Sequence, residues 1–453
     1  MLPAATMPPH APEPTAPRAA LHSMGCRLNH AETAVLQTSL EQAGYRIVSW
    51  GEPAELLVIN SCTVTGASDA KGRQVLRAMR RRFPGAKLAL LGCYAQVDGA
   101  ALAAEGLADL VIGNGGKMQL VEHLARLDTA REPLYVNTPI SRAPFALETF
   151  AAPGAATRAH LKVQDGCDFM CSFCIIPVAR GRARPRRLEN LLAEARALAG
   201  AGVRELVLTG VNIGTWALEG LGLPQMVDAL ACIDGVERIR ISSIEPTTVD
   251  EALLSRMADP GHALVPFLHL PLQSGSPAVL AAMRRRHGAA DYRAFAERAL
   301  AQVPGLCLGT DVMVGFPGEG DEEFADTVAL LAALPFAYLH VFPYSRRNGT
   351  RALRLPEHVA PAVSRRRAAT LRALSESKRL AFQRRHLGRS LPVLFEGGGA
   401  PGEAAGYTEN YIRVRVTHPR PATLRNRILP VRLIEAGAGG VAGELAAEPL
   451  ARS

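Results

Sequence analysis

The chain has few cysteines for its length, and it lacks a long uninterrupted apolar run and an internal repeat. Eight cysteines among 453 residues are too few for a disulfide scaffold, which leaves metal binding, catalysis or burial as their roles. Residues 1–20 are rich in Pro and Ala and contain one basic residue, Arg18, so we expect a disordered extension at 1–18 rather than a secretory signal.

The longest uncharged stretch, 327–344, is interrupted by Pro335. It is better explained by a helix at 322–334 and a strand at 338–342 than by a membrane span. We therefore expect a cytoplasmic protein with reduced thiols and no membrane partner.

The composition indicates a folded, basic protein. Hydrophobic residues make up 48% of the chain, and 51 Lys and Arg against 42 Asp and Glu give a net charge of +9. The length predicts about three domains. Basic clusters favour polyanions such as nucleic acid, although solvated helix faces are the plainer interpretation. The densest cluster follows a cysteine motif and comprises Arg180, Arg182, Arg184, Arg186 and Arg187.

The first region, 19–135, alternates short apolar runs with helical patterns, which predicts a parallel α/β sheet. Its first three runs, at 20–24, 56–59 and 88–91, are each followed by a cysteine: Cys26, Cys62 and Cys93. Ligands of open α/β sheets bind outside the carboxyl ends of the strands, so these three thiols could converge. A second metal cluster competes here with simple burial of the thiols.

After a Pro- and Ala-rich linker at 136–157, the region 158–383 repeats strand and helix six times. This pattern predicts a barrel or a partial TIM barrel, (βα)6, with its active site at the carboxyl ends of the strands. Strands are expected at 160–164, 205–208, 238–241, 267–270, 308–314 and 338–342, and helices at 188–200, 223–232, 278–285 and 291–302. For the last region, 384–453, the pattern predicts a small all-β module with strands at 411–416 and 429–434. The overall class is therefore α/β with a β module at the end.

The most informative motif spaces three cysteines as CxxxCxxC, at Cys167, Cys171 and Cys174. Three thiolates on a [4Fe–4S] cluster leave one iron open for a small molecule, here S-adenosylmethionine. Zinc is the alternative, but a structural zinc site usually completes four protein ligands, and no fourth Cys or His lies nearby. Cys232 and Cys307 are expected to be packing residues.

The second region resembles the radical S-adenosylmethionine enzymes, whose hallmark is CxxxCxxC. The whole chain resembles the methylthiotransferases of that superfamily over nearly all of residues 20–435, and the last region looks like their RNA-binding TRAM domain, with an insert at 397–406. The matching segments are 25–32, 60–65, 92–96, 164–181, 208–214, 271–276, 311–319 and 343–346.

The resemblance implies that a methylthio group replaces the hydrogen on carbon 2 of an adenine. It implies two [4Fe–4S] clusters facing one pocket and two molecules of S-adenosylmethionine per turnover, one as methyl donor and one cleaved to a 5′-deoxyadenosyl radical. The implied partners are a tRNA anticodon loop, an electron donor such as flavodoxin or ferredoxin, and a sulfur source.

Segments 238–246 and 340–345 are most similar to the branch that modifies N6-threonylcarbamoyladenosine at position 37 of tRNA. The alternatives are N6-isopentenyladenosine in tRNA, an aspartate of a ribosomal protein, and a non-catalytic RNA-binding iron–sulfur protein.

The resemblance also implies roles for individual residues, each with a plainer interpretation as a turn, a cap or a solvated loop. Asn29 and Glu32 are expected near the first thiol triplet. The arginine cluster, with Tyr411, Arg413 and Arg415, is expected to bind RNA phosphates and bases. The expected contacts of S-adenosylmethionine are Phe173, Thr209, Gly210, Asn212, Glu245, Gln273, Ser274, Val314, Gly315 and Phe316.

Overall fold

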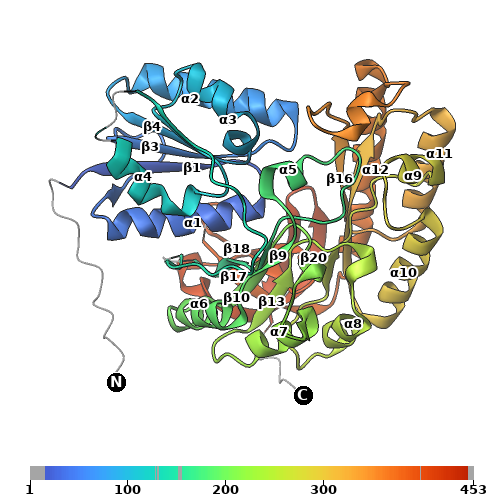
Figure 1. Ribbon diagram of the computed structural model, residues 1–453. Helices are drawn as coiled ribbons and strands as arrows, with labels where there is room; N and C mark the ends of the chain where they lie inside the picture. Colours follow the sequence, from blue (N-terminus) through green and yellow to red (C-terminus); the bar gives the residue numbers. More distant parts are fainter. Residues whose placement is uncertain (1–15, 128, 130–131, 152–155, 398, 447–453) are drawn as a thin grey trace. The chain divides into compact units, whose positions relative to one another are not determined.

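The computed structural model describes residues 16–127, 129, 132–151, 156–397 and 399–446, which form two compact units (Figure 1). Of the described residues, the first unit holds those within 16–142, 147–151 and 175–181, and the second holds those within 143–146, 156–174 and 182–446. Most of the expected extension lies outside the described residues, but Arg18 already belongs to a strand. In the described part of the chain, no helix is long and apolar enough to cross a membrane.

The first unit is built on a six-stranded sheet in which all neighbouring strands are parallel, in the order β2-β1-β3-β4-β5-β6. Its strands are β1 (Arg18–Ser23), β2 (Arg46–Ile47), β3 (Leu56–Ser61), β4 (Lys87–Gly92), β5 (Leu110–Ile112) and β6 (Leu134–Val136). Its helices are α1 (Arg27–Gln42), α2 (Gly66–Arg82), α3 (Cys93–Ala104), α4 (Leu120–Leu127) and α5 (Ile176–Arg180), with a 3-10 turn η1 (Lys117–Gln119).

Helices cover both faces of this sheet, α1 and α4 on one and α2 and α3 on the other (Figure 1). Leu36 of α1 shares a core with Leu120 of α4, and Leu76 of α2 shares a separate core with Leu102 of α3. The strand order reverses beside β1, because β2 lies on one side of it and β3 on the other. Such a switch point is where doubly wound sheets bind ligands.

The second unit contains a six-stranded partial barrel, as the sequence predicts. Two parallel three-stranded sheets, β13-β10-β7 and β14-β15-β16, are linked by a parallel bridge between Ile239 and Leu264. The strands are β7 (Arg158–Lys162), β10 (Glu205–Thr209), β13 (Arg238–Ile241), β14 (Phe267–His269), β15 (Cys307–Val314) and β16 (Tyr338–Pro343). The helices are α6 (Leu188–Gly200), α7 (Leu223–Ala231), α8 (Glu251–Ala258), α9 (Pro277–Ala282), α10 (Ala289–Gln302) and α11 (Asp321–Ala333).

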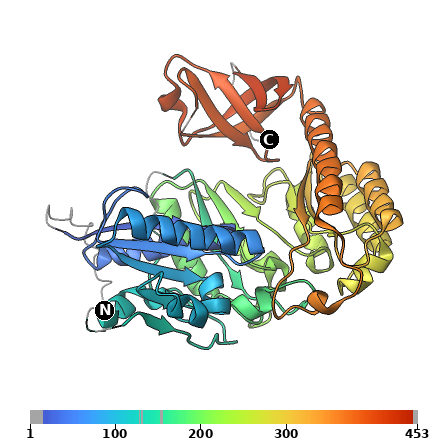
Figure 2. The ribbon, with the colours of Figure 1, turned by 90° about the horizontal axis from the view of Figure 1, so that it is seen from above.

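The long helix α12 (Pro361–Arg384) leads from the partial barrel to a closed five-stranded β barrel (Figure 2). The five strands are β17 (Ser390–Glu396), β18 (Glu403–Thr408), β19 (Arg413–Thr417), β20 (Ile428–Gly437) and β21 (Gly440–Leu445). Four short strands complete the unit: β8 (Gln164–Asp165), β9 (Arg184–Pro185), β11 (Ala217–Leu218) and β12 (Leu221–Gly222).

Four expectations need correction. The described part of 397–406 is not simply an insert, because its second half forms part of β18. Tyr411 is not in a strand: it has a φ of +63° in the turn before β19. Helix α5 belongs to the first unit although it follows the CxxxCxxC motif. A single boundary near residue 158 therefore does not separate the two units, because the chain returns to the first unit at residues 175–181. Cys232 is exposed after α7, whereas Cys307 is buried as expected.

Candidate cluster and cofactor sites

Cys26, Cys62 and Cys93 lie at the carboxyl ends of three adjacent parallel strands. Cys62 directly follows β3, Cys93 directly follows β4, and Cys26 lies three residues beyond β1 at the start of α1. The three thiols are close enough to influence one another: Cys93 raises the pKa of both other thiols. The structure therefore brings together the triplet that the sequence predicts.

The backbone fits tightly around these thiols. A Cβ atom on Gly25, which has a φ of +86°, would lie 2.5 Å from the Sγ of Cys62. Cys62 and Cys93 are buried, and burial raises the pKa of Cys62 to about 11, whereas Cys26 keeps an exposed edge. Two enclosed thiols and one open thiol suit a cluster that is held by protein on one side and accessible on the other.

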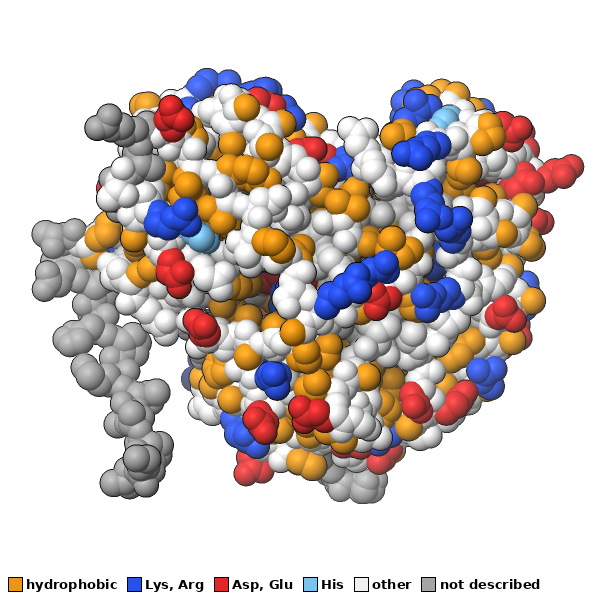
Figure 3. Space-filling model, in the orientation of Figure 1, with side chains coloured by type: hydrophobic (Ala, Val, Ile, Leu, Met, Phe, Trp, Pro, Cys, Tyr) orange, Lys and Arg blue, Asp and Glu red, His pale blue; other side chains and the backbone are white. Residues whose placement is uncertain are grey.

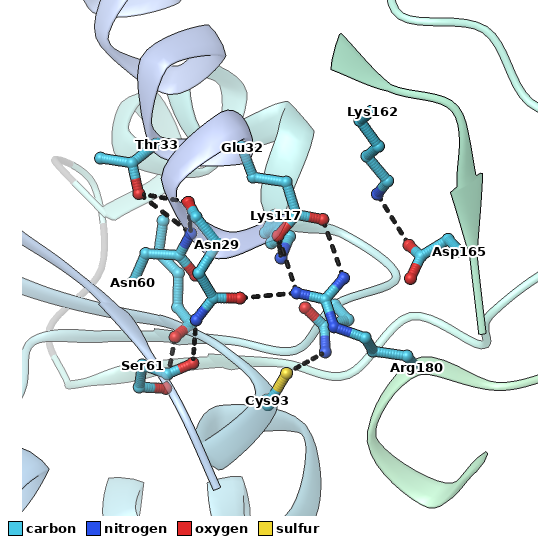
Figure 4. Close-up of polar contacts among 12 residues, drawn as sticks. Asn29, Glu32, Thr33, Asn60, Ser61, Cys93, Lys117, Lys162, Asp165 and Arg180 are labelled. Atoms are coloured by element: carbon cyan, nitrogen blue, oxygen red, sulfur yellow. Dashed lines mark hydrogen bonds and ion pairs between the residues drawn. The ribbon is translucent and has the colours of Figure 1, made fainter. Parts of the chain in front are cut away.

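A buried polar network lies at the start of α1 and reaches Cys93 (Figure 4). The guanidinium of Arg180 donates to Oδ1 of Asn29 at 2.6 Å and to both carboxylate oxygens of Glu32 at 3.0 and 2.9 Å. Glu32 also pairs with Lys117 at 2.5 Å. Asn114 donates to the Sγ of Cys93 at 3.4 Å.

This network reaches Cys26 electrostatically. The protein atoms packed around Cys26 raise its pKa, Arg180 opposes that shift, and Glu32 adds to it. Asn29 and Glu32 thus lie near the start of α1 beside Cys26, with their side chains paired to Arg180, and their contact with a cluster stays a prediction.

Cys167, Cys171 and Cys174 lie in the loop after β7 and β8, and all three are partly exposed. The loop is anchored from the middle, because Ser172 donates through its backbone N–H to Met283 O at 2.9 Å and through its hydroxyl to Ala282 O at 2.8 Å. The backbone N–H of Phe169 donates to the Sγ of Cys167 at 3.4 Å. Such anchoring holds the three thiols on one short loop.

Arg285 links this loop to Glu245, one of the expected cofactor contacts. Its guanidinium donates to the Sγ of Cys171 at 3.5 Å, to Oε1 of Glu245 at 3.0 Å and to Pro271 O at 2.7 Å. Burial raises the pKa of Cys171, and the nearby Arg285 charge partly opposes this shift. Glu245 is therefore held beside the thiol loop.

The turn after β10 is held against the end of β7 by Gln164. Oε1 of Gln164 accepts hydrogen bonds from the backbone N–H groups of Val211 and Asn212 at 2.9 and 3.1 Å. Asn212 is 1% exposed, and its Nδ2 has no hydrogen-bond partner among the described residues. A buried amide donor without a partner is costly, so this turn fits a polar ligand such as the carboxylate or ribose of S-adenosylmethionine.

Most of the expected cofactor contacts lie at the ends of two pairs of barrel strands, β10 with β13 and β14 with β15. Thr209, Gly210 and Asn212 lie at the turn after β10, near Glu245 after β13. Gln273 and Ser274 follow β14, while Val314, Gly315 and Phe316 mark the end of β15, and Phe316 packs edge-on against Phe173 at 6.4 Å. All these residues lie at or just beyond carboxyl ends of barrel strands, the usual place for an active site.

The arginine cluster does not form one exposed basic strip. Arg180 is 1% exposed in the network described above, and Arg186 is completely buried with Glu194 and Asn190. Both guanidinium groups pair with protein atoms, so the prediction that Arg180 and Arg186 bind RNA phosphates is wrong. Arg182 and Arg187 keep more exposed side chains, whereas Arg184 is 14% exposed and lies 3.4 Å from Asp165. Basic residues stand in several separate places on the face shown in Figure 3.

Tyr411 lies where the β barrel meets the partial barrel within the second unit. Its ring stacks on Tyr407 at 4.8 Å, and the guanidinium groups of Arg158 and Arg240 lie 5.7 and 4.7 Å from its centre. The Tyr411 ring is occupied by these contacts within the protein, so the prediction that Tyr411 stacks on RNA bases is wrong. Arg413 is exposed, and Arg415 lies 4.0 Å from Glu403.

Sequence reasoning missed several residues that hold these sites. Lys117 and Asn114 follow the end of β5, where a Gly- and Asn-rich turn was a usable signal. Arg285 gave no local signal, because its partners Cys171 and Glu245 are distant in sequence.

Comparison with known proteins agrees with this architecture. Residues 161–331 match the family model of the radical SAM superfamily, and residues 18–113 match that of "Uncharacterized protein family UPF0004". The solved structure of TsrM from Kitasatospora setae, a radical S-adenosylmethionine methyltransferase with cobalamin and a [4Fe–4S] cluster bound, has a TM-score of 0.54 at 15% identity, covering 75% of this chain and 77% of that one. At that identity the likeness concerns the fold alone.

Closer relatives define the family. The Bacillus subtilis protein "Threonylcarbamoyladenosine tRNA methylthiotransferase MtaB" is 34% identical over 92% of this chain and 94% of its own. The Cereibacter sphaeroides "tRNA-2-methylthio-N(6)-dimethylallyladenosine synthase" is 35% identical over 94% of this chain and 97% of its own.

The fold and the CxxxCxxC loop thus define a radical SAM enzyme. Within that class, the chain belongs to the radical SAM methylthiotransferases. Membership of the superfamily implies a [4Fe–4S] cluster and S-adenosylmethionine as cofactors. The three anchored thiols fit the cluster, and Nδ2 of Asn212, which lacks a partner among the described residues, fits the cofactor.

Proposed function

We propose that this enzyme inserts a methylthio group at carbon 2 of N6-threonylcarbamoyladenosine at position 37 of tRNA. The observation that carries the proposal is the pair of thiol triplets, one at the switch point of a parallel sheet and one in the CxxxCxxC loop. A single [4Fe–4S] cluster suffices to cleave S-adenosylmethionine, so a second thiol triplet calls for a second task, for which holding the transferred sulfur is suited.

The protein's own residues position the reactants. Cys26, Cys62 and Cys93 would hold an auxiliary [4Fe–4S] cluster, and Cys167, Cys171 and Cys174 would hold the cluster that supplies the electron for cleaving S-adenosylmethionine. Asn212 and Glu245 offer a donor and an acceptor for the polar parts of S-adenosylmethionine. Two molecules of this cofactor serve each turnover, one as methyl donor.

In this proposal Thr209 and Gly210 after β10, and Gln273 and Ser274 after β14, belong to the same cradle. Phe316 and Phe173, which pack in one apolar cluster, would form an apolar wall with Val314 and Gly315 at the end of β15. A reductant such as flavodoxin or ferredoxin, and a sulfur source, complete the set of partners that the chemistry requires. Arg182, Arg184 and Arg187, with Arg413 and Arg415, remain candidates for contacts to anticodon-loop phosphates, and those contacts would weaken as salt rises.

A second candidate substrate is the isopentenyl-type adenosine. It is favoured by a specific observation, since the Cereibacter sphaeroides protein named for a dimethylallyl substrate is as similar to this chain as the Bacillus subtilis protein. Both candidates share the same chemistry at carbon 2 and differ only in the group on N6.

Mass spectrometry of tRNA nucleosides from a deletion strain distinguishes the two candidates. We expect loss of the methylthio form of threonylcarbamoyladenosine and its recovery with the intact gene but not with a Cys93→Ala gene. Loss of the methylthio isopentenyl nucleoside instead would transfer the assignment to the second candidate. Both tRNA candidates would be refuted if the deletion left all tRNA nucleosides unchanged. An unmodified ribosomal-protein aspartate in the same strain would then point to the ribosomal-protein alternative.

A further inference from the structure

Three polar side chains meet on one face of the partial barrel, outside the thiol loop and the cofactor turns described above. His269 of β14 places its Nε2 2.9 Å from Oδ1 of Asp311 on β15, and His340 of β16 places its Nδ1 3.3 Å from the same oxygen. Asp311 and His340 are direct neighbours in the strand register. The triad therefore spans three adjacent parallel strands.

This triad is fixed from one side and open on the other. Nδ1 of His269 is 3.0 Å from the hydroxyl of Tyr338, and the ring of Tyr338 stacks over Phe267 at 6.4 Å. The side chain of His269 is only 7% exposed, whereas that of His340 is 52% exposed. His340 thus presents its remaining edge to whatever enters above the sheet.

An aromatic surface lies beside the open edge. Phe342 follows His340 by two residues on β16, so both side chains project from the same face, and Phe342 is 42% exposed. The two rings are 6.3 Å apart, and Phe342 pairs in register with Met313. Met313, like Phe173, packs against the buried cluster that contains Phe316, which connects this surface to the proposed cofactor wall.

We propose that Phe342 stacks on the substrate base while His340, held by Asp311 and His269, binds the polar group on N6 of that base. The inference rests on the proposed function and names the residues that read its substrate. Exposed bases of single-stranded loops are recognised by stacking on aromatic rings and by hydrogen bonds to their edges. A threonylcarbamoyl group brings a carboxylate, a hydroxyl and a ureido group, each of which can pair with an imidazole edge.

The triad selects against an apolar substituent for the same reason. Burial alone would raise the pKa of Asp311, but the contacts from His269 and His340 reverse this shift and keep the carboxylate ionised. An isopentenyl group would cover the charged cluster without supplying a hydrogen bond. Sites built to pair a substrate polar group reject an analogue that lacks it, because the site's own groups are then left unpaired.

The test uses the cluster-loaded, reduced full-length enzyme with anticodon stem-loops that carry either threonylcarbamoyladenosine or isopentenyladenosine. We compare wild type with His340→Leu, His340→Asn and Asp311→Asn. The matched control is His262→Asn, which alters another His–Asp pair of the second unit, with Nε2 of His262 3.3 Å from Asp228. Formation of 5′-deoxyadenosine without RNA reports whether the cofactor site survives each substitution.

We expect His340→Leu to lower kcat/KM for the threonylcarbamoyl stem-loop by about 10- to 100-fold, mainly through KM, with 5′-deoxyadenosine formation retained. His340→Asn should recover part of that loss, and His262→Asn should match wild type. Wild-type kinetics of His340→Leu and Asp311→Asn on this stem-loop would overturn the inference while leaving the proposed function intact.

Two further outcomes would overturn it in different ways. If the wild-type enzyme modified the isopentenyl stem-loop but not the threonylcarbamoyl stem-loop, the proposed function and the inference would both be refuted. One equivalent of zinc that is present in wild type and lost in His340→Leu would show that the triad is a metal site instead, since two imidazoles and a carboxylate are also zinc ligands.

Discussion

Replacing Arg180 by methionine should loosen the start of α1 beside the first thiol triplet. Arg180 makes three hydrogen bonds to Asn29 and Glu32, all between side chains that are about 1% exposed or less. Methionine has a similar length but supplies none of them. The substitution therefore removes paired charge and leaves an amide oxygen without a donor inside the first unit.

The expected cost follows from these contacts. Breaking a buried ion pair by removing one partner typically costs about 3–5 kcal/mol, and an orphaned buried acceptor about 1–3 kcal/mol. Lys117 remains beside Glu32 and offsets part of the loss. We expect a net loss of about 3 kcal/mol, which corresponds to roughly a 100-fold drop in protection of the α1 amides from hydrogen exchange.

Native-state hydrogen exchange of the full-length protein, read by mass spectrometry over α1, measures this loss directly. The control is Arg182→Met, because Arg182 is 39% exposed and lies 3.6 Å from an exposed Asp168, an ion pair worth little. Protection within threefold of wild type would refute the reasoning, since Arg180 would then contribute no net stability to the network.

Other changes test the remaining sites. Alanine at Cys26, Cys62 and Cys93 together should lower iron from about eight to about four per chain while 5′-deoxyadenosine formation persists, and iron unchanged by the substitutions would exclude the auxiliary cluster. Asn212→Ala should weaken binding of S-adenosylmethionine about tenfold by calorimetry, because a donor in the proposed cradle is lost; unchanged affinity would remove Asn212 from it. Burial, aided by Arg285, lowers the pKa of His287 to about 4. The free energy of unfolding of the apo-protein should therefore fall by about 2 kcal/mol between pH 7 and pH 5, because the unfolded state takes up the proton first. His287→Leu should flatten this pH dependence of thermal stability, and an unchanged slope would contradict the prediction.

The strands and many helices could be predicted from the sequence because their apolar runs are short and separated by clear turns. The expected strand at 238–241 and the expected helix at 188–200 are confirmed with the same bounds by β13 and α6. The uncharged stretch around Pro335 is confirmed as helix α11 and strand β16. Burial of apolar side chains decides these elements locally, so local pattern suffices.

Long-range pairing is what the sequence pattern could not supply. Arg180 looked like one member of a basic cluster, yet its partner Glu32 lies 148 residues earlier in the chain. Tyr411 looked like the first residue of an alternating strand, but its left-handed backbone turns the ring toward Arg158 and Arg240. In both cases a charged or aromatic residue is placed by a partner that no local window contains.

The same local device recurs at thiols of both units and explains why cysteine positions were readable when arginine positions were not. Gly25 and Gly166 each precede a cysteine, and their φ angles of +86° and +69° lie in the left-handed region that favours glycine. A chain leaving a strand through such a residue turns sharply, which keeps the next thiol near the strand end. The Gly-Cys pair after an apolar run thus encodes a ligand position within a few residues, whereas a buried arginine depends on the whole fold.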